Sequence, residues 1–361
     1  MESNIPEEMV QEILLRSPVK SLLRFKCVCK QWLSLISDPS FAKSHFELSA
    51  APSHRLLFPI SYSDSEAQSI DVDVPFHDES AVVSLIHPLP KFDVSCCIFE
   101  VFGSCRGFVL FSVFSSNLYV WNPSNGVHRP LSLSFSHLIR KIRKSNIYTL
   151  LIGFGHDPST DDYLVVVVSQ NEEGNHMMLF SLKTNSWKKI QLSHIPHTGY
   201  YKLHGLFING AIHWLIFPHH GSDPGVIIVF DLTEKQLSAI SLPDGDFKFG
   251  YLSGRDLIIT GGCLSFWEPR LVCSTKGGEL VALNDANLMK FNDKGELLEI
   301  HRKYDRLDWF RASFLYREST LSIHALCNID LISSQCYSNV CSSFLPITSK
   351  RKKKELRNIY L

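Results

Sequence analysis

The chain has 361 residues, of which 45% are hydrophobic and 20% are charged, and its formal net charge is zero. This composition is typical of a soluble globular chain with room for one large and one small domain. The absence of a basic surplus argues against a nucleic-acid binder, and no apolar run reaches the length of a membrane span. The N-terminus is acidic and polar, so the sequence predicts no signal peptide.

The first forty residues carry more apolar side chains than a surface segment does. Met9, Val10, Ile13 and Leu14 lie three or four residues apart, so we expect them to share one helical face, from which Leu15 departs. Helices of about ten residues are marginal alone in water. This segment therefore needs to pack on its own helices, on the rest of the chain or on another protein.

Proline and capping residues predict where the helices begin and end. Pro6 suits the first position of a helix. Pro18 disfavours a helical conformation at Ser17, so the first helix should stop there. Two further short helices follow, and Asp38-Pro39 reads as the cap and first residue of a last helix that extends to about residue 50.

The order and spacing of these residues resemble an F-box over about forty residues. The resemblance is carried by Ile5-Pro6, Ile13-Leu14-Leu15, Ser17 to Leu22 and Val28 to Trp32, with Ile5 and Ser17 standing where the family more often has Leu. In that family the motif binds a Skp-type adaptor, which joins a cullin–RING ubiquitin ligase. The resemblance implies these adaptor-binding residues: Ile5, Pro6, Val10, Ile13, Leu14, Leu15, Pro18, Val19, Leu22, Val28 and Trp32. The alternative is an ordinary three-helix cap on the following domain.

From Val94 onward, short β-branched and aromatic runs alternate with turn residues. Four of these units read as strand, polar turn and strand, and the last aromatic before each turn is Trp121, Phe180, Phe230 or Phe291. The intervals are 59, 50 and 61 residues. A repeat of about fifty residues made of short strands is typical of a β-propeller blade.

The expected fold is therefore mainly β, with a small all-α segment followed by a propeller-like domain of about six blades, some of them incomplete. Val165–Val168 and Ile212–Phe217 are continuous apolar runs and predict strands buried on both faces. A β-sandwich is the alternative, but it would not give a repeat around a ring.

The repeat region resembles the F-box-associated domain, a kelch-like β-propeller found in a large family of plant F-box proteins. The resemblance is carried by Gly103–Gly107, Trp121-Asn122-Pro123, Gly153-Phe154-Gly155, Asp157-Pro158, Asp162-Tyr163, Phe180-Ser181-Leu182, Asn209–Trp214 and Phe230-Asp231-Leu232. It reaches to about residue 265. At Trp267 the chain runs straight into Glu268-Pro269, and about half a blade is missing, which leaves the closure of the ring open.

We expect three parts: a helical F-box over 1–48, the propeller over 49–330 and a tail over 331–361. The tail is rich in Ser and Cys and contains the basic run Lys350–Lys354. This run is either a nuclear signal or a solvated, disordered segment. The corresponding expectation is a protein of the cytoplasm, the nucleus or both.

The sequence offers no catalytic set. It contains no nucleophile elbow, phosphate loop, dinucleotide fingerprint or zinc helix. His219-His220 would point to opposite faces of a strand, and turn chemistry explains Asp161-Asp162. No two of the ten cysteines have Cys-x-x-Cys spacing, which favours a reduced intracellular protein. We therefore expect no metal and no cofactor.

The resemblance implies the substrate-recognition subunit of a Skp–cullin–F-box ubiquitin ligase, in which the F-box binds the adaptor and the propeller binds a target protein. The alternatives are a propeller scaffold outside any ligase and a propeller enzyme with a helical cap. The sequence does not identify the target. Candidate loops for one face are Ser115–Asn117, Asn171–His176, His194–Tyr200 and Phe217–Pro224.

Overall fold

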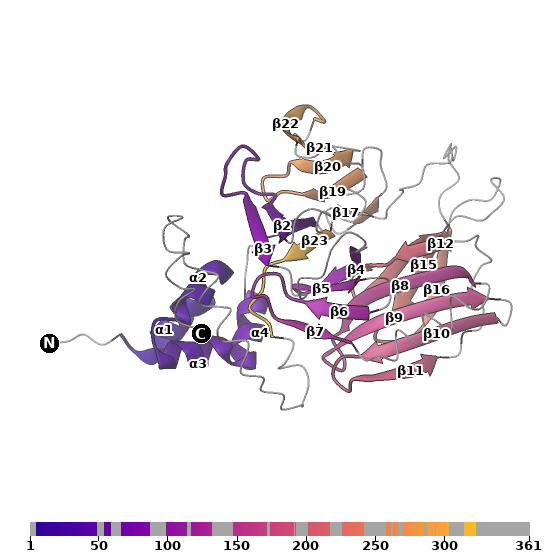
Figure 1. Cartoon of the computed structure of the whole chain (residues 1–361), viewed down its shortest axis with the longest axis horizontal. Helices are drawn as coiled ribbons and strands as arrows, with labels where there is room; N and C mark the ends of the chain where they lie inside the picture. Colours follow the sequence, from indigo (N-terminus) through magenta and orange to yellow (C-terminus); the bar gives the residue numbers. More distant parts are fainter. Residues whose placement is uncertain are drawn as a thin grey trace, which may run out of the picture.

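The computed structural model of the chain is mainly β, with four short helices at its N-terminus (Figure 1). The structure describes residues 5–48, 54–58, 66–86, 99–113, 117–131, 147–171, 174–190, 192, 201–216, 226–241, 258–260, 263–265, 270–284, 287–292, 294–302 and 314–322. In this part of the chain, no helix combines the length and the apolar character needed to cross a membrane.

The helices begin and end close to the predicted residues. They are α1 (Glu7–Leu15), α2 (Val19–Phe25), α3 (Lys30–Ser37) and α4 (Pro39–Leu48). Pro6 precedes the first residue of α1, and α1 ends before Pro18. Asp38 caps α4, because its Oδ1 accepts hydrogen bonds from the backbone N–H groups of Ser40 at 2.8 Å and Phe41 at 3.2 Å.

The strands form six sheets. Four of them consist of strands that are consecutive in the sequence. One contains β4 (Phe99–Cys105), β5 (Phe108–Val113), β6 (Asn117–Trp121) and β7 (His128–Pro130), and another contains β13 (Leu206–Ile208), β14 (Ala211–Ile216), β15 (Val226–Asp231) and β16 (Leu237–Ser241). The third contains β17 (Ile258–Thr260) and β18 (Cys263–Ser265), and the fourth contains β19 (Arg270–Ser274), β20 (Leu280–Asn284), β21 (Asn287–Phe291) and β22 (Leu297–Arg302). The other two recruit a strand from further along: β8 (Ile147–Asp157), β9 (Asp162–Asn171), β10 (Gly174–Ser181) and β11 (Ser186–Ile190) with β12 (Tyr201–His204), and β1 (His54–Phe58), β2 (Glu66–Asp71) and β3 (Val82–Ile86) with β23 (Phe314–Arg317).

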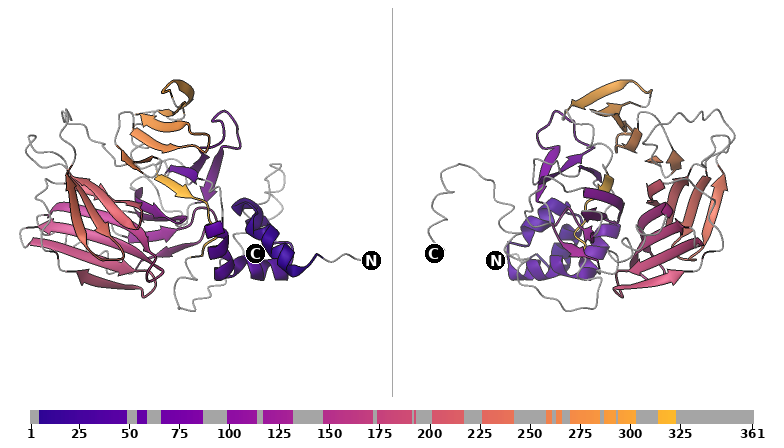
Figure 2. Two further views of the ribbon diagram at one scale, coloured as in Figure 1. Left: turned by 180° about the vertical axis from the view of Figure 1, so that it is seen from behind. Right: turned by 45° about the vertical axis from the view of Figure 1, so that its right-hand side comes forward.

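The sheets are arranged as the blades of a propeller (Figure 2). Clusters of buried side chains join the β1–β3 sheet to β4–β7, β4–β7 to β8–β11, and β8–β11 to β13–β16. A fourth cluster returns from the β19–β22 sheet to β1–β3 through Cys273 and Leu56. Among the described residues, five sheets have four or five strands, one fewer than the expected blade count of about six, and the β17–β18 sheet has two strands.

The C-terminal strand closes this ring. β23 pairs antiparallel with β1, which places Tyr316 opposite Arg55 and Leu315 opposite Leu56. The Tyr316 hydroxyl lies 2.8 Å from Ser69 Oγ, which also accepts a hydrogen bond of 2.7 Å from Arg55 Nε. The first sheet of the propeller is thus completed by residues about 260 positions away. The shortened segment at Trp267, where the sequence leaves closure of the ring open, lies outside the described residues.

The two apolar runs are buried on both faces, as predicted. Every residue from Val165 to Val168 and from Ala211 to Ile216 is buried. Trp214 reaches the neighbouring blade and donates from Nε1 to the carbonyl of Ile152 at 3.1 Å. Its ring passes so close to Gly205 that a Cβ there would lie 2.6 Å from Nε1, so this position requires glycine.

A C-terminal strap, residues 319–321, follows β23 and crosses the β6–β7 turn. Asn122 Nδ2 donates to the carbonyls of Ser319 at 3.1 Å and Leu321 at 2.9 Å. Ser319 packs so tightly on Gly107 that a Cβ at this glycine would lie 2.2 Å from the Ser319 hydroxyl. The Trp-Asn-Pro and Cys-Arg-Gly segments noted in the sequence thus hold the end of the ring-closing segment.

The substitution Asn122→Asp tests this contact because it keeps the acceptor oxygen and removes the donor. It should lower the free energy of unfolding by about 1–3 kcal/mol, since the buried Ser319 carbonyl loses its partner. Denaturant unfolding monitored by fluorescence measures this change. Asn292→Asp is the matched control, because among the described residues the partner of Asn292 Nδ2 is the nearby, exposed Glu296. Equal effects of the two substitutions would contradict the role of the strap.

Candidate protein-binding surface

The N-terminal helices have a small core of their own. Leu14 and Leu22 are 1% and 0% exposed and pack with Leu15, Ile36 and Phe41. This corrects the helical face expected from the sequence, which grouped Met9 and Ile13 with Leu14 and set Leu15 apart. Leu14 and Leu15 both face the core, because α1 packs against α2, α3 and α4 with the side of the helix that carries them.

The candidate adaptor-binding residues therefore divide into two groups. Four are buried inside the chain: Leu14, Leu15, Val19 and Leu22. Seven are exposed or half-buried: Ile5, Pro6, Val10, Ile13, Pro18, Val28 and Trp32. The first group maintains the packing of the helices, and only the second can touch another molecule without unfolding them.

The exposed group includes an apolar stripe along α1. Met9 and Ile13 are 57% and 56% exposed, and their four-residue spacing places them on one side of α1. Ile5, which is 60% exposed, precedes the helix. Met9 belongs to this stripe although it is absent from the candidate residues, and its spacing from Ile5 and Ile13 is the signal that identifies it. Val28 is a further exposed apolar residue, in the turn before α3. Exposed side chains of this size at regular spacing are a feature of helical docking surfaces.

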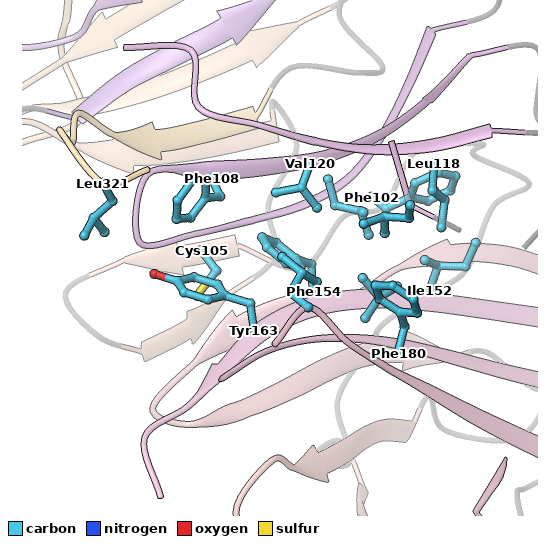
Figure 3. Packing of buried hydrophobic residues seen from close by; sticks show 14 of the residues in the cluster. Phe102, Cys105, Phe108, Leu118, Val120, Ile152, Phe154, Tyr163, Phe180 and Leu321 are labelled. Carbon is cyan, nitrogen blue, oxygen red and sulfur yellow. The ribbon is translucent and has the colours of Figure 1, made fainter. Parts of the chain in front are cut away.

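The last helix attaches this group to the propeller. Phe46 of α4 is 7% exposed, and with Ala42 it joins the buried cluster that holds Phe108, Phe154 and Leu321. Figure 3 shows the propeller side of this cluster, where Phe108 and Cys105 lie near Leu321 and Tyr163. In Figure 1, α1, α2 and α3 lie on the side of α4 away from the propeller.

An ion pair reinforces the attachment at the β8–β9 turn. Lys43 Nζ lies 2.8 Å from Asp161 Oδ2, and His156 Nε2 lies 2.9 Å from the other carboxylate oxygen. The hydrogen bond from Lys43 lowers the pKa of Asp161, and burial lowers the pKa of His156. Asp161 adopts φ of +49°, so the Asp161-Asp162 pair serves turn geometry and domain contact rather than cation binding.

The described residues carry no sign of a catalytic or metal centre. They contain no group of three or more His, Cys, Asp or Glu side chains that could hold a metal ion. Cys105 and Cys273 are buried, and burial raises the pKa of both thiols, that of Cys273 to about 12. Such thiols are poor nucleophiles. His219-His220 and most of the candidate target loops lie outside the described residues.

A helical docking module joined to a β-propeller is thus the class of protein that the fold and the surface define. Comparison with known families agrees: residues 2–44 match the F-box domain, and residues 55–304 match the F-box associated beta propeller domain. The chain belongs to the family of F-box proteins with an F-box-associated propeller.

Similar proteins come from Arabidopsis thaliana. F-box/kelch-repeat protein At3g23880 is 30% identical over 293 residues, or 76% of this chain and 73% of that protein. F-box protein CPR1 is 28% identical over 73% of this chain and 66% of its own length. Putative F-box protein At3g16210 is 28% identical over 67% of this chain and 62% of its own length. A gluconolactonase structure from Xanthomonas campestris aligns with a TM-score of only 0.32 over 71% of this chain and 88% of that chain, which supports no inference.

The two groups of F-box residues should respond differently to truncation. Leu14→Ala should cost about 2–5 kcal/mol of stability, because it leaves a cavity in the small helical core. Ile13→Ala, at the adjacent exposed position, should change stability by less than about 0.5 kcal/mol. Urea unfolding followed by circular dichroism at 222 nm measures both. A loss of stability in Ile13→Ala equal to that in Leu14→Ala would contradict this division.

The buried histidines predict a pH dependence. Burial lowers the pKa of His45, His54, His156 and His213 below the ordinary value of 6.5, so the folded chain binds fewer protons than the unfolded chain. Their contribution to stability is therefore complete at pH 7.5 and decreases as the pH falls below about 6.5. The melting temperature should fall between pH 7.5 and 5.5, and the variant His45→Gln/His156→Gln should show a weaker dependence. A melting temperature that is constant over this range would contradict the prediction.

Proposed function

We propose that this chain is the substrate-recognition subunit of a Skp–cullin–F-box ubiquitin ligase. The single observation that carries the proposal is the apolar stripe Ile5, Met9 and Ile13, each of which is more than half exposed. Membership of the F-box family supports a Skp-type adaptor as its partner. Each such side chain contributes roughly 1.5–3 kcal/mol when a partner buries it.

In this proposal the propeller holds the target protein and makes no bond itself. The turns that contact α4 or the strap connect β4 with β5, β6 with β7, and β8 with β9. Neighbouring strands in these sheets are antiparallel, so β5 and β6, and likewise β9 and β10, meet at the other end of the ring. We assign target binding to that end, where the strands that flank the candidate loops terminate.

The proposed contribution to ubiquitination is proximity. A target held on the propeller stays close to the enzyme that the adaptor and cullin bring, which raises the effective concentration of target lysines. This role needs no catalytic residue in the chain. The cytoplasm, the nucleus or both are the corresponding proposed locations, with the basic run Lys350–Lys354 as the candidate nuclear signal.

Co-expression with a Skp-type adaptor, followed by affinity capture, tests the proposal. Wild type should capture the adaptor, and Ile13→Glu should weaken capture at least tenfold, because it puts a charge into the apolar contact. Gln11→Glu adds the same charge to the same helix about 200° around the axis from Met9, and it should bind like wild type. Leu14 and Leu22 are unsuitable for this test because their substitution disturbs the core.

Three outcomes separate the candidate functions. Capture by wild type and by Gln11→Glu, with loss in Ile13→Glu, supports a ligase subunit. Capture by none of the three proteins leaves a propeller scaffold or an unrecognised enzyme. Equal capture by all three would show that the adaptor binds elsewhere on the chain, and the stripe would lose its assigned role.

A further inference from the structure

The aromatic ring of Phe46 in α4 contacts the propeller, and the side chains of Arg106 and Arg317 lie against it. The guanidinium carbon of Arg317 lies 3.7 Å from the centroid of the Phe46 ring, and that of Arg106 lies 4.8 Å from it. Arg317 Nη2 also donates to the Phe46 carbonyl, and Arg106 Nη2 lies 3.5 Å from Glu47 Oε1. Cation–π contacts of this kind are stronger where they are shielded from water.

The two arginines come from separate parts of the ring. Arg106 is in the β4–β5 turn, where its φ of +47° is unusual for a residue with a side chain. Arg317 is the last residue of β23, the strand that closes the ring. The contact with Phe46 therefore joins α4 to the second blade and to the closing strand at once.

Charge keeps this contact assembled. The two guanidinium groups lie near one ring and repel each other, and their contacts with the ring, the Phe46 carbonyl and the Glu47 carboxylate offset that repulsion. All three groups belong to α4 or its carboxyl end. If α4 moved away, the two cations would remain close together and would lose their contacts with the ring, the carbonyl and the carboxylate. These contacts therefore favour the docked position of the helix.

The path of the chain adds to this constraint. Only Asp38, the residue that caps α4, separates α3 from α4, and β1 begins six residues after α4 ends. The helices with the exposed stripe are packed on α4 through Phe41 and through His45 Nε2, which lies 2.8 Å from the Ser17 carbonyl. The direction of α4 on the propeller therefore fixes the direction of the stripe.

We propose that Phe46, Arg106 and Arg317 form a positioning joint that holds the F-box at one fixed orientation relative to the target-binding end of the propeller. The consequence for ubiquitination rests on the proposed function, whereas the fixed orientation is a property of the chain alone. A rigid joint limits the lysines of a bound target that can come near the transferring enzyme. A flexible joint would spread transfer over many lysines at lower effective concentration.

Single-molecule energy transfer in the full chain tests the joint. Fluorophores are placed at Ser34 in α3 and Lys189 in β11, both exposed. Wild type should give one narrow distance distribution, and Phe46→Ala should at least double its width. Leu48→Ala is the matched control, since Leu48 lies in the same helix but is 62% exposed, and it should leave the width unchanged. If Phe46→Ala folds poorly, the decisive variant is Arg106→Ala, which removes one of the two cations next to the ring.

Two results would overturn the inference: a wild-type distribution as broad as that of the variants, or folded variants as narrow as wild type. Adaptor capture by Phe46→Ala should stay within about twofold of wild type, because Phe46 is buried against the propeller and is not part of the exposed stripe. Failure of wild type to capture an adaptor would refute the proposed function and would leave the distance measurement intact. The two failures are thus distinguishable.

Discussion

The pairing of β23 with β1 is the constraint on which the rest of the structure depends. It completes the first sheet with a strand from the far end of the chain, so β1 is paired on both sides. The same strand ends at Arg317, which contacts Phe46, and continues into the strap held by Asn122. Closure of the propeller and attachment of the helices therefore share residues, and neither part of the chain is independent of the other.

The N-terminal helices illustrate how one short segment serves two purposes. Four short helices cannot bury among themselves all the apolar residues that this segment carries. Leu14 and Leu22 form the core, Phe46 enters the propeller, and the stripe on α1 stays in water. An exposed apolar stripe has a cost in solubility, and a partner that covers it is the simplest physical reason for the sequence to keep it.

Much of the fold is visible in the sequence. Proline and Asp38 predict the helix ends, the aromatic repeat predicts a propeller, and the runs at Val165–Val168 and Ile212–Trp214 predict strands buried on both faces. The predicted buried face of α1 was wrong at two positions, because Ile13 is exposed and Leu15 is buried. Spacing alone does not say which side of a helix meets its neighbours. Long-range contacts such as that of Phe46 with Arg317 were beyond reach, because no local pattern links residues 271 positions apart.

The most recognisable residues of the propeller are those that hold the chain together. Arg106, Asn122 and Asp161 lie in turns at the end that faces α4, and each is engaged with the helix or the strap. A residue with several fixed partners tolerates few replacements. Turns with these intramolecular contacts carry several of the motifs by which the sequence resembles the family, whereas target binding is proposed for the opposite end. Identification of the family and identification of the target are therefore separate problems, and only the first has its answer in these motifs.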